Sequence, residues 1–242
     1  MKRVIAAVAL CAGVLTALPL NFASAEVQEK TAEFNGGTLR YKVVLPNGFD
    51  PAKTYPAVLA FPPGGQDMNM VDATLNQNYR DEAERRGYIV IEPAAPDGLF
   101  FFEAGAGLFP AFLVKLLGDY KILDDKFHAA GNSNGGLSAF LIASRFPQYF
   151  WSVTGFPGFL QDATQQQIAA LSRMCIHMFV GEQDTGWPDE MRGQVAIFRR
   201  YGYNVTLAVE KGQPHVIQTL TGAGAGRLFD QFDAARKGQC AQ

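Results

Sequence analysis

The segment Gly131-Asn132-Ser133-Asn134-Gly135 has the residue types of a sharp turn that exposes a nucleophilic serine. It follows a short apolar run, 127–130, and precedes 137–146, which has helical apolar spacing and ends at a proline. Glycines two positions to either side of Ser133 allow the backbone to turn tightly from a strand into a helix. The serine hydroxyl then lies at the helix N-terminus, where the dipole favours developing negative charge. We therefore expect Ser133 to be a nucleophile.

A serine hydroxyl needs a base that removes its proton and a carboxylate that orients the base. His215 lies in a loop shortly after the predicted strand 205–209, where such a base should stand. The other two histidines, His128 and His177, fall inside predicted strands and are expected in the core or on a sheet face. The order serine, aspartate, histidine along the chain also favours His215.

The carboxylate is expected in the loop that follows the predicted strand 175–180. Asp184 is the best placed, because Glu182 is too close to the strand end to turn back. Asp189 is the second choice, although it has the position of an acid in the first turn of a helix.

Two backbone N–H groups should stabilise the oxyanion that forms when the serine attacks a carbonyl. Asn134, the residue after the nucleophile, supplies one. The other should come from the loop after strand 55–61, which begins Pro62-Pro63-Gly64-Gly65. Proline has no N–H, so Gly64 and Gly65 are the two candidates.

Strand-like apolar runs alternate with amphipathic helical segments along the chain. The expected strands are 39–45, 55–61, 88–92, 127–130, 150–154, 175–180 and 205–209, and the expected helices are 72–86, 111–120, 163–172, 190–201 and 227–237, besides the one after Ser133. This order predicts an α/β fold with a mostly parallel sheet and helices on both faces, without a large cap domain. Ligands on such sheets bind at the carboxyl ends of the strands.

The first 25 residues have the pattern of a bacterial secretory signal peptide: Lys2 and Arg3, an apolar stretch, and Ala23-Ser24-Ala25 as a cleavage site. We therefore expect a single domain over 26–242, secreted or periplasmic, without stable membrane insertion. The chain carries 21 Lys and Arg against 23 Asp and Glu with no basic tract, so nucleic acid is not an expected partner. No cysteine or histidine cluster suggests a metal.

Together these segments resemble the α/β-hydrolase superfamily, and within it the secreted polyhydroxybutyrate depolymerase and feruloyl esterase-like group. Ser133-Asn134-Gly135-Gly136 is similar to that group's S-N-G-G turn, and Gly64-Gly65-Gln66 resembles its H-G-x-G-Q oxyanion loop. Here Pro62-Pro63 replaces the usual His-Gly. The resemblance implies ester hydrolysis through a serine acyl-enzyme, without a cofactor or metal, on a small-molecule or polymeric ester.

Two aromatic, glycine-rich loops, 97–110 and 154–159, follow strand ends on the expected active-site side. We expect Phe101, Phe102, Phe156 and Trp187 to form an aromatic wall for an acyl group. Two rival functions stay open: a peptidase similar to prolyl oligopeptidase, and a catalytically silent binding protein with the same fold.

Two cysteines lie outside the leader. Cys175 begins a strand, so it lies at the end of the sheet opposite the active site. The final helix runs back toward that end and should bring Cys240 there. A disulfide between them is therefore expected in an oxidising compartment.

Overall fold

The computed structural model describes residues 26–34 and 37–240. The expected signal peptide, 1–25, lies outside these residues. The eight strands are β1 (Glu26–Phe34), β2 (Gly37–Leu45), β3 (Tyr55–Phe61), β4 (Ile89–Pro93), β5 (Ile122–Gly131), β6 (Phe150–Gly155), β7 (Cys175–Gly181) and β8 (Val205–Glu210). The α-helices are α1 (Met68–Thr74), α2 (Arg80–Arg86), α3 (Phe109–Asp119), α4 (Asn134–Arg145), α5 (Gln165–Ala170), α6 (Trp187–Arg200) and α7 (Gly226–Ala235).

The strands form one sheet in the order β1-β2-β4-β3-β5-β6-β7-β8. β1 pairs antiparallel with β2 and β2 antiparallel with β4, whereas every later neighbour is parallel. The parallel part brings the carboxyl ends of β3, β5, β7 and β8 to the same edge of the sheet. This edge is where the loops that carry the candidate residues begin.

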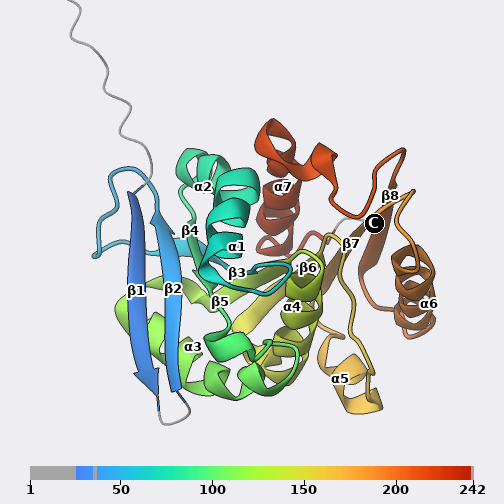
Figure 1. The fold of residues 1–242 in the computed structure, drawn as a ribbon, viewed down its shortest axis with the longest axis horizontal. Coiled ribbons are helices and arrows are strands. Elements are labelled where there is room, and N and C mark those ends of the chain that lie inside the picture. Colours follow the sequence, from blue (N-terminus) through green and yellow to red (C-terminus); the bar gives the residue numbers. More distant parts are fainter. Residues whose placement is uncertain (1–25, 35–36, 241–242) are drawn as a thin grey trace, which may run out of the picture.

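The core lies in two layers, one on each face of the sheet. Alternate residues of each strand point to opposite faces, so Leu59 of β3 packs in one layer and its neighbours Val58 and Ala60 pack in the other. Helices α3, α4 and α6 contribute to the first layer, and α1, α2 and α7 to the second. Figure 1 shows α1, α2 and α7 together on one side of the sheet, with α3 on the other. The expected α/β architecture with helices on both faces is therefore confirmed.

Two elements differ from the expectation. The described part begins with an additional edge strand, β1, in which Ala32 is the one buried residue and most of the others are polar. The helix expected over 72–86 begins earlier, at Met68, because the Asp67 carboxylate accepts from the N–H groups of Asn69 and Met70. A wide π-helical turn, Leu75–Tyr79, then separates α1 from α2.

Of the two expected places, core or sheet face, both strand histidines take the core: they are buried. His128 Nδ1 pairs with Ser152 Oγ at 2.8 Å, and His177 Nδ1 with Thr206 Oγ1 at 3.2 Å. Burial lowers the pKa of His128 to about 3 and that of His177 to about 4. Both rings are therefore neutral in the folded protein above these values.

The buried histidines should make the folded state sensitive to acid. In the unfolded chain a histidine has a pKa of about 6.5, so below this pH each ring binds a proton in the unfolded chain but not in the folded one. The stability that is present above about pH 6.5 is therefore lost as the pH falls. Between pH 8 and pH 5, wild type should lose about 2 kcal/mol more of its free energy of unfolding than His128→Gln. Urea unfolding of both proteins at the two pH values measures the difference.

Wild type and His128→Gln differ only at residue 128, so the difference between them reports on the His128 ring. Buried Glu92, whose pKa is raised well above its usual value by burial, titrates in the opposite sense but is present in both proteins. An equal pH dependence of wild type and His128→Gln would contradict the account.

Candidate active site

Ser133 occupies the tight turn between β5 and α4. Its backbone has φ 57° and ψ −123°, a combination that non-glycine residues rarely adopt. The flanking glycines are required by space: a Cβ on Gly131 would lie 2.2 Å from the Gly135 carbonyl oxygen, and one on Gly135 would lie 1.9 Å from the Phe61 carbonyl oxygen. The turn therefore holds Ser133 at the carboxyl edge of the sheet and packs α4 directly against the end of β3.

Ser133, His215 and Asp184 form a continuous hydrogen-bonded chain. His215 Nε2 lies 2.9 Å from Ser133 Oγ, and His215 Nδ1 lies 2.8 Å from Asp184 Oδ2. The Asp184 side chain is 5% exposed and that of His215 is 37% exposed, so the carboxylate is buried behind a ring that reaches the surface. This arrangement matches a nucleophile, a base and a carboxylate that orients the base.

The loops that carry the acid and the base are packed together by backbone contacts. The Gln183 N–H donates to the Gln213 carbonyl at 2.9 Å. A Cβ on Gly181, at the end of β7, would lie 2.1 Å from the Pro214 carbonyl oxygen, so only glycine allows this approach. The position of His215 therefore follows from the pairing of β7 with β8 and from this loop contact.

The other acidic candidates bond to partners other than His215. Asp189, the second choice from the sequence, is exposed in the first turn of α6 and forms an ion pair with Arg192 at 3.0 Å. Glu182 accepts a hydrogen bond from the Gly212 N–H at 2.9 Å. Asp184 is the carboxylate that the structure brings to the histidine.

The three candidate oxyanion donors lie on two neighbouring segments. The Asn134 side chain donates from Nδ2 to the Gly64 carbonyl at 2.8 Å, which joins the start of α4 to the loop after β3. Within the described residues, the backbone N–H groups of Gly64, Gly65 and Asn134 have no hydrogen-bond acceptor. These three N–H groups are therefore not used by the protein's own backbone.

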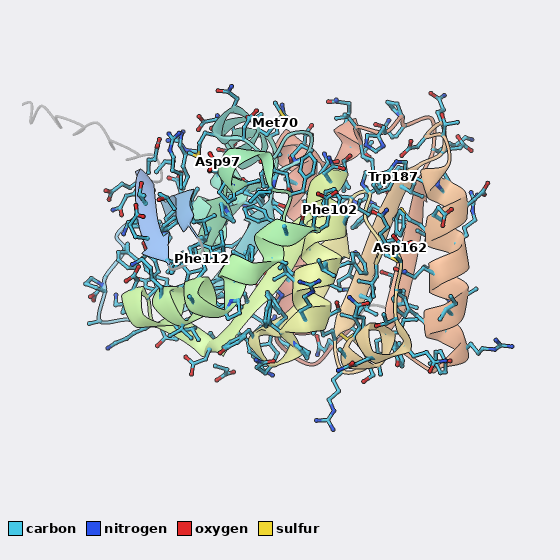
Figure 2. All side chains as sticks on the ribbon, turned by 60° about the horizontal axis from the view of Figure 1, so that its bottom comes forward. Met70, Asp97, Phe102, Phe112, Asp162 and Trp187 are labelled. Atoms are coloured by element: carbon cyan, nitrogen blue, oxygen red, sulfur yellow. A yellow bond between two sulfur atoms is a disulfide. The ribbon has the colours of Figure 1, made fainter. Side chains whose placement is uncertain are left out.

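A shallow hollow of about 460 Å³ lies beside Trp187, whose ring contacts that of His215, although Ser133, Asp184 and His215 do not themselves line it. Its lining residues come from α4, the loops after β6 and β7, and the start of α6: Leu137, Phe159, Gln161, Asp162, Thr185, Gly186, Trp187 and Glu190. The Trp187 ring lies 5.1 Å from the His215 ring and 5.3 Å from the Phe159 ring, measured between centroids. Figure 2 shows Trp187 and Asp162 close together on this part of the surface. Trp187 therefore lies between this hollow and the His215 ring.

The expected aromatic wall is corrected at two of its four positions. Phe101 is 0% exposed and packs against Phe61 and Phe109 in one core layer, while Phe156 is 2% exposed and packs against Tyr79 in the other. Buried on all sides, neither ring can contact a substrate. The loops turn inward because a large apolar ring gains more from leaving water than from lining an open surface.

Of the remaining aromatic side chains, Phe102 is half-buried and stacks on Phe100 with centroids 5.1 Å apart. Phe159 packs on Trp187 in the hollow. Phe156 and Phe159 lie in the same apolar loop, and no feature of the sequence distinguished one from the other. Phe159 therefore lines the hollow without having been among the predicted residues.

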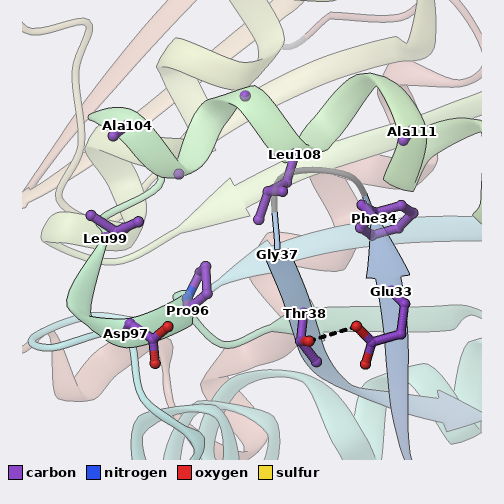
Figure 3. A pocket seen from close by; sticks show the side chains of 12 residues that line it. Glu33, Phe34, Gly37, Thr38, Pro96, Asp97, Leu99, Ala104, Leu108 and Ala111 are labelled. Carbon is purple, nitrogen blue, oxygen red and sulfur yellow. Dashed lines mark hydrogen bonds between the residues drawn. The ribbon is translucent and has the colours of Figure 1, made fainter.

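A second hollow of about 560 Å³ lies between the β1–β2 hairpin and residues 96–111. Figure 3 shows Pro96, Leu99 and Leu108 around it, with the Thr38 hydroxyl donating to the Glu33 carboxylate at 2.7 Å. None of Ser133, Asp184, His215 or the candidate oxyanion donors lines it. It also shares no lining residue with the hollow at Trp187, the residue whose ring contacts His215.

The described residues contain a disulfide at the end of the sheet opposite the candidate active site, and neither a metal-binding group of side chains nor a membrane-spanning helix. Cys175 and Cys240 are joined by a disulfide, with Cα atoms 5.2 Å apart, at the end of β7 opposite Asp184. In residues 26–34 and 37–240, no group of three or more His, Cys, Asp or Glu side chains could hold a metal ion. Over the same residues, no helix is both long and apolar enough to cross a membrane.

Comparison with solved structures defines the fold. A feruloyl esterase module from Clostridium thermocellum matches with a TM-score of 0.66 at 15% identity, covering 79% of this chain and 82% of that one. An S-formylglutathione hydrolase from Agrobacterium tumefaciens matches with a TM-score of 0.65 at 14% identity, covering 89% and 95%. A thermostable esterase matches with a TM-score of 0.63 at 17% identity, covering 88% of this chain and 62% of its own. No protein-family profile and no curated protein sequence matches. The chain has the α/β-hydrolase fold.

Proposed function

We propose that this protein is a serine hydrolase that cleaves carboxylic esters through an acyl-enzyme. The observation that carries the proposal is the hydrogen-bonded chain from Ser133 through His215 to Asp184 at the carboxyl edge of the sheet. The α/β-hydrolase fold supports it, because structures with this fold and similar topology include proteins named as esterases.

The first half of the reaction forms the acyl-enzyme. His215 Nε2 takes the proton of Ser133 Oγ as the oxygen attacks the ester carbonyl carbon. The carbonyl π electrons move onto oxygen, and the N–H groups of Asn134 and of a loop glycine, Gly64 or Gly65, stabilise that oxyanion. The tetrahedral intermediate collapses, the C–O bond to the alcohol breaks, and His215 gives its proton to the leaving oxygen.

The second half returns the free enzyme. His215 removes a proton from a water molecule, which attacks the acyl carbon, and the acid leaves as Ser133 Oγ regains the proton. Asp184 accepts the hydrogen bond of Nδ1–H throughout, which fixes the ring and stabilises its protonated form. None of these steps requires a metal or an organic cofactor.

The hollow beside His215 is the proposed place of the acyl group. Trp187, Phe159 and Leu137 give it apolar walls; Trp187 contacts the His215 ring, and Leu137 lies one helical turn after Ser133. Feruloyl, hydroxyalkanoate and simple acyl esters all supply an apolar group of a size that such a hollow takes.

We further propose that 26–242 is one exported domain. The Cys175–Cys240 disulfide supports export, because such bonds persist in oxidising compartments. The expected signal peptide supports it from the sequence.

The proposed function is tested with a series of 4-nitrophenyl esters from acetate (C2) to dodecanoate (C12). The dependence of the rate on chain length reports on the size of the acyl pocket. Wild type should release 4-nitrophenol with saturable kinetics, and one fluorophosphonate molecule per chain should stop the reaction. Folded wild type that hydrolyses no member of the series would contradict the proposal.

A further inference from the structure

Gln66 is a buried polar residue that the reaction described above does not use. It follows the two candidate oxyanion glycines and is 0% exposed. Its backbone has φ 54°, the left-handed region that glutamine rarely adopts. A long amide side chain held in a rare backbone conformation under the surface of an active site indicates a specific task.

Every polar atom of the Gln66 side chain has a partner. Nε2 donates to the Pro62 carbonyl at 3.1 Å and to Ser138 Oγ at 2.9 Å, and Oε1 accepts from the Phe101 N–H at 3.0 Å. These partners lie on three different segments: the loop after β3, helix α4 and the loop before α3. The amide group therefore joins segments that are far apart in the sequence.

The backbone of Gln66 adds two further bonds. Its N–H donates to the Pro63 carbonyl at 3.0 Å, which closes a turn around Gly64 and Gly65. Its carbonyl accepts from the Ala95 N–H at 2.7 Å, which ties the turn to the end of β4. The turn that carries the loop donor is thus fixed from both ends.

The network also reaches the second oxyanion donor. Ser138 Oγ donates to the Asn134 carbonyl at 2.8 Å, one helical turn back on α4. The Asn134 amide in turn donates to the Gly64 carbonyl at 2.8 Å. Hydrogen bonds therefore run from the glycine turn through Gln66 and Ser138 to Asn134, and return directly from Asn134 to the turn.

We propose that Gln66 is a positioning residue that sets the geometry of the oxyanion hole, by fixing the glycine turn relative to the Asn134 N–H. The inference rests on the proposed function. Glutamine suits this place because its amide offers two donors and an acceptor at once. A glutamate would bury a charge against the Pro62 carbonyl, and an apolar residue would leave Phe101 and Pro62 without their partners.

The test is the Gln66→Met protein, which keeps the length and volume of the side chain. A donor displaced by a fraction of an ångström binds the tetrahedral oxyanion poorly but binds the planar ester almost as before. We expect kcat to fall about 10- to 100-fold with KM changed by less than about twofold. The affinity for a trifluoromethyl ketone, which forms a tetrahedral adduct with the serine, should fall by the same factor as kcat/KM.

Asn78→Leu provides the matched control for a merely structural effect. Asn78 is another buried amide that donates to a backbone carbonyl, that of Leu220 at 2.9 Å, in the core layer formed by α1, α2 and α7. It should lower the thermal midpoint and leave kcat within about twofold. Gln66→Met that lowers the midpoint equally and leaves kcat and ketone affinity unchanged would overturn the inference.

The link through α4 gives a second measurement. Ser138→Ala removes one step of the network and should lower kcat less than Gln66→Met does. If the two residues act through one network, the double variant should be about as slow as Gln66→Met alone. If the losses in kcat of the two single variants add fully in the double variant, the inference of one shared network is overturned. Failure of the esterase proposal itself is recognised separately, because then wild type hydrolyses no ester and forms no ketone adduct.

Discussion

Ser133→Ala should lower kcat for ester hydrolysis by at least about 10⁴-fold, because the attacking oxygen is gone and the remaining groups can only polarise the carbonyl toward water. The turn, α4 and the bond between His215 and Asp184 do not depend on the hydroxyl. The thermal midpoint should therefore change little. Initial rates with the preferred 4-nitrophenyl ester, together with a thermal melt of each protein, make the measurement.

Ser144→Ala is the matched control for this substitution. Ser144 is a buried serine near the end of the same helix, with its hydroxyl bonded to the Leu141 carbonyl at 2.8 Å. It should keep the wild-type rate. Comparable turnover by Ser133→Ala and Ser144→Ala would show that another group performs the attack.

Gly135→Ala should damage the fold and the site together. The added Cβ would lie 1.9 Å from the Phe61 carbonyl oxygen and 2.7 Å from that of Pro62, so α4 or the oxyanion loop has to move. Forced backbone shifts of this kind cost about 3 kcal/mol or more, which for a domain of this size lowers the thermal midpoint by roughly 6–12 °C. The folded fraction should also lose about 10²-fold in kcat, because the same shift displaces the oxyanion donors.

Gly193→Ala tests whether that damage is specific to the contact with Phe61. Gly193 lies within α6, and nothing is within 4 Å of the Cβ that alanine would add. Alanine is the better helix former by about 1 kcal/mol, so this variant should melt a few degrees higher and keep its activity. A Gly135→Ala protein as stable and active as Gly193→Ala would refute the packing described at the end of β3.

Much of this fold follows from local sequence pattern. Buried parallel strands are continuous apolar runs, so 55–61 and 175–180 could be placed with only a one-residue change at one end. Ser133, Asp184 and His215 were proposed from a tight glycine turn and from the loops after two strands. Those inferences need only the chain order and the common edge of a parallel sheet.

Other features depend on tertiary contacts that no local pattern carries. β1 has few buried side chains, and its strand conformation comes from pairing with β2. Whether a phenylalanine in an apolar loop faces the site or the core depends on where the loop folds, so Phe101 and Phe156 could not be separated from Phe159. The task proposed for Gln66 rests on bonds to Ser138 and Phe101, 72 and 35 residues away.

The most direct test of the central claim is to trap the covalent intermediate. Wild type is mixed with the preferred 4-nitrophenyl ester, quenched in acid during the first turnover, digested, and its peptides are weighed by mass spectrometry. We expect the mass of one acyl group on the peptide that contains Ser133, and its absence from Ser133→Ala treated in the same way. Rapid ester turnover with the acyl group on any other residue, or on none, would show that Ser133 is not the nucleophile.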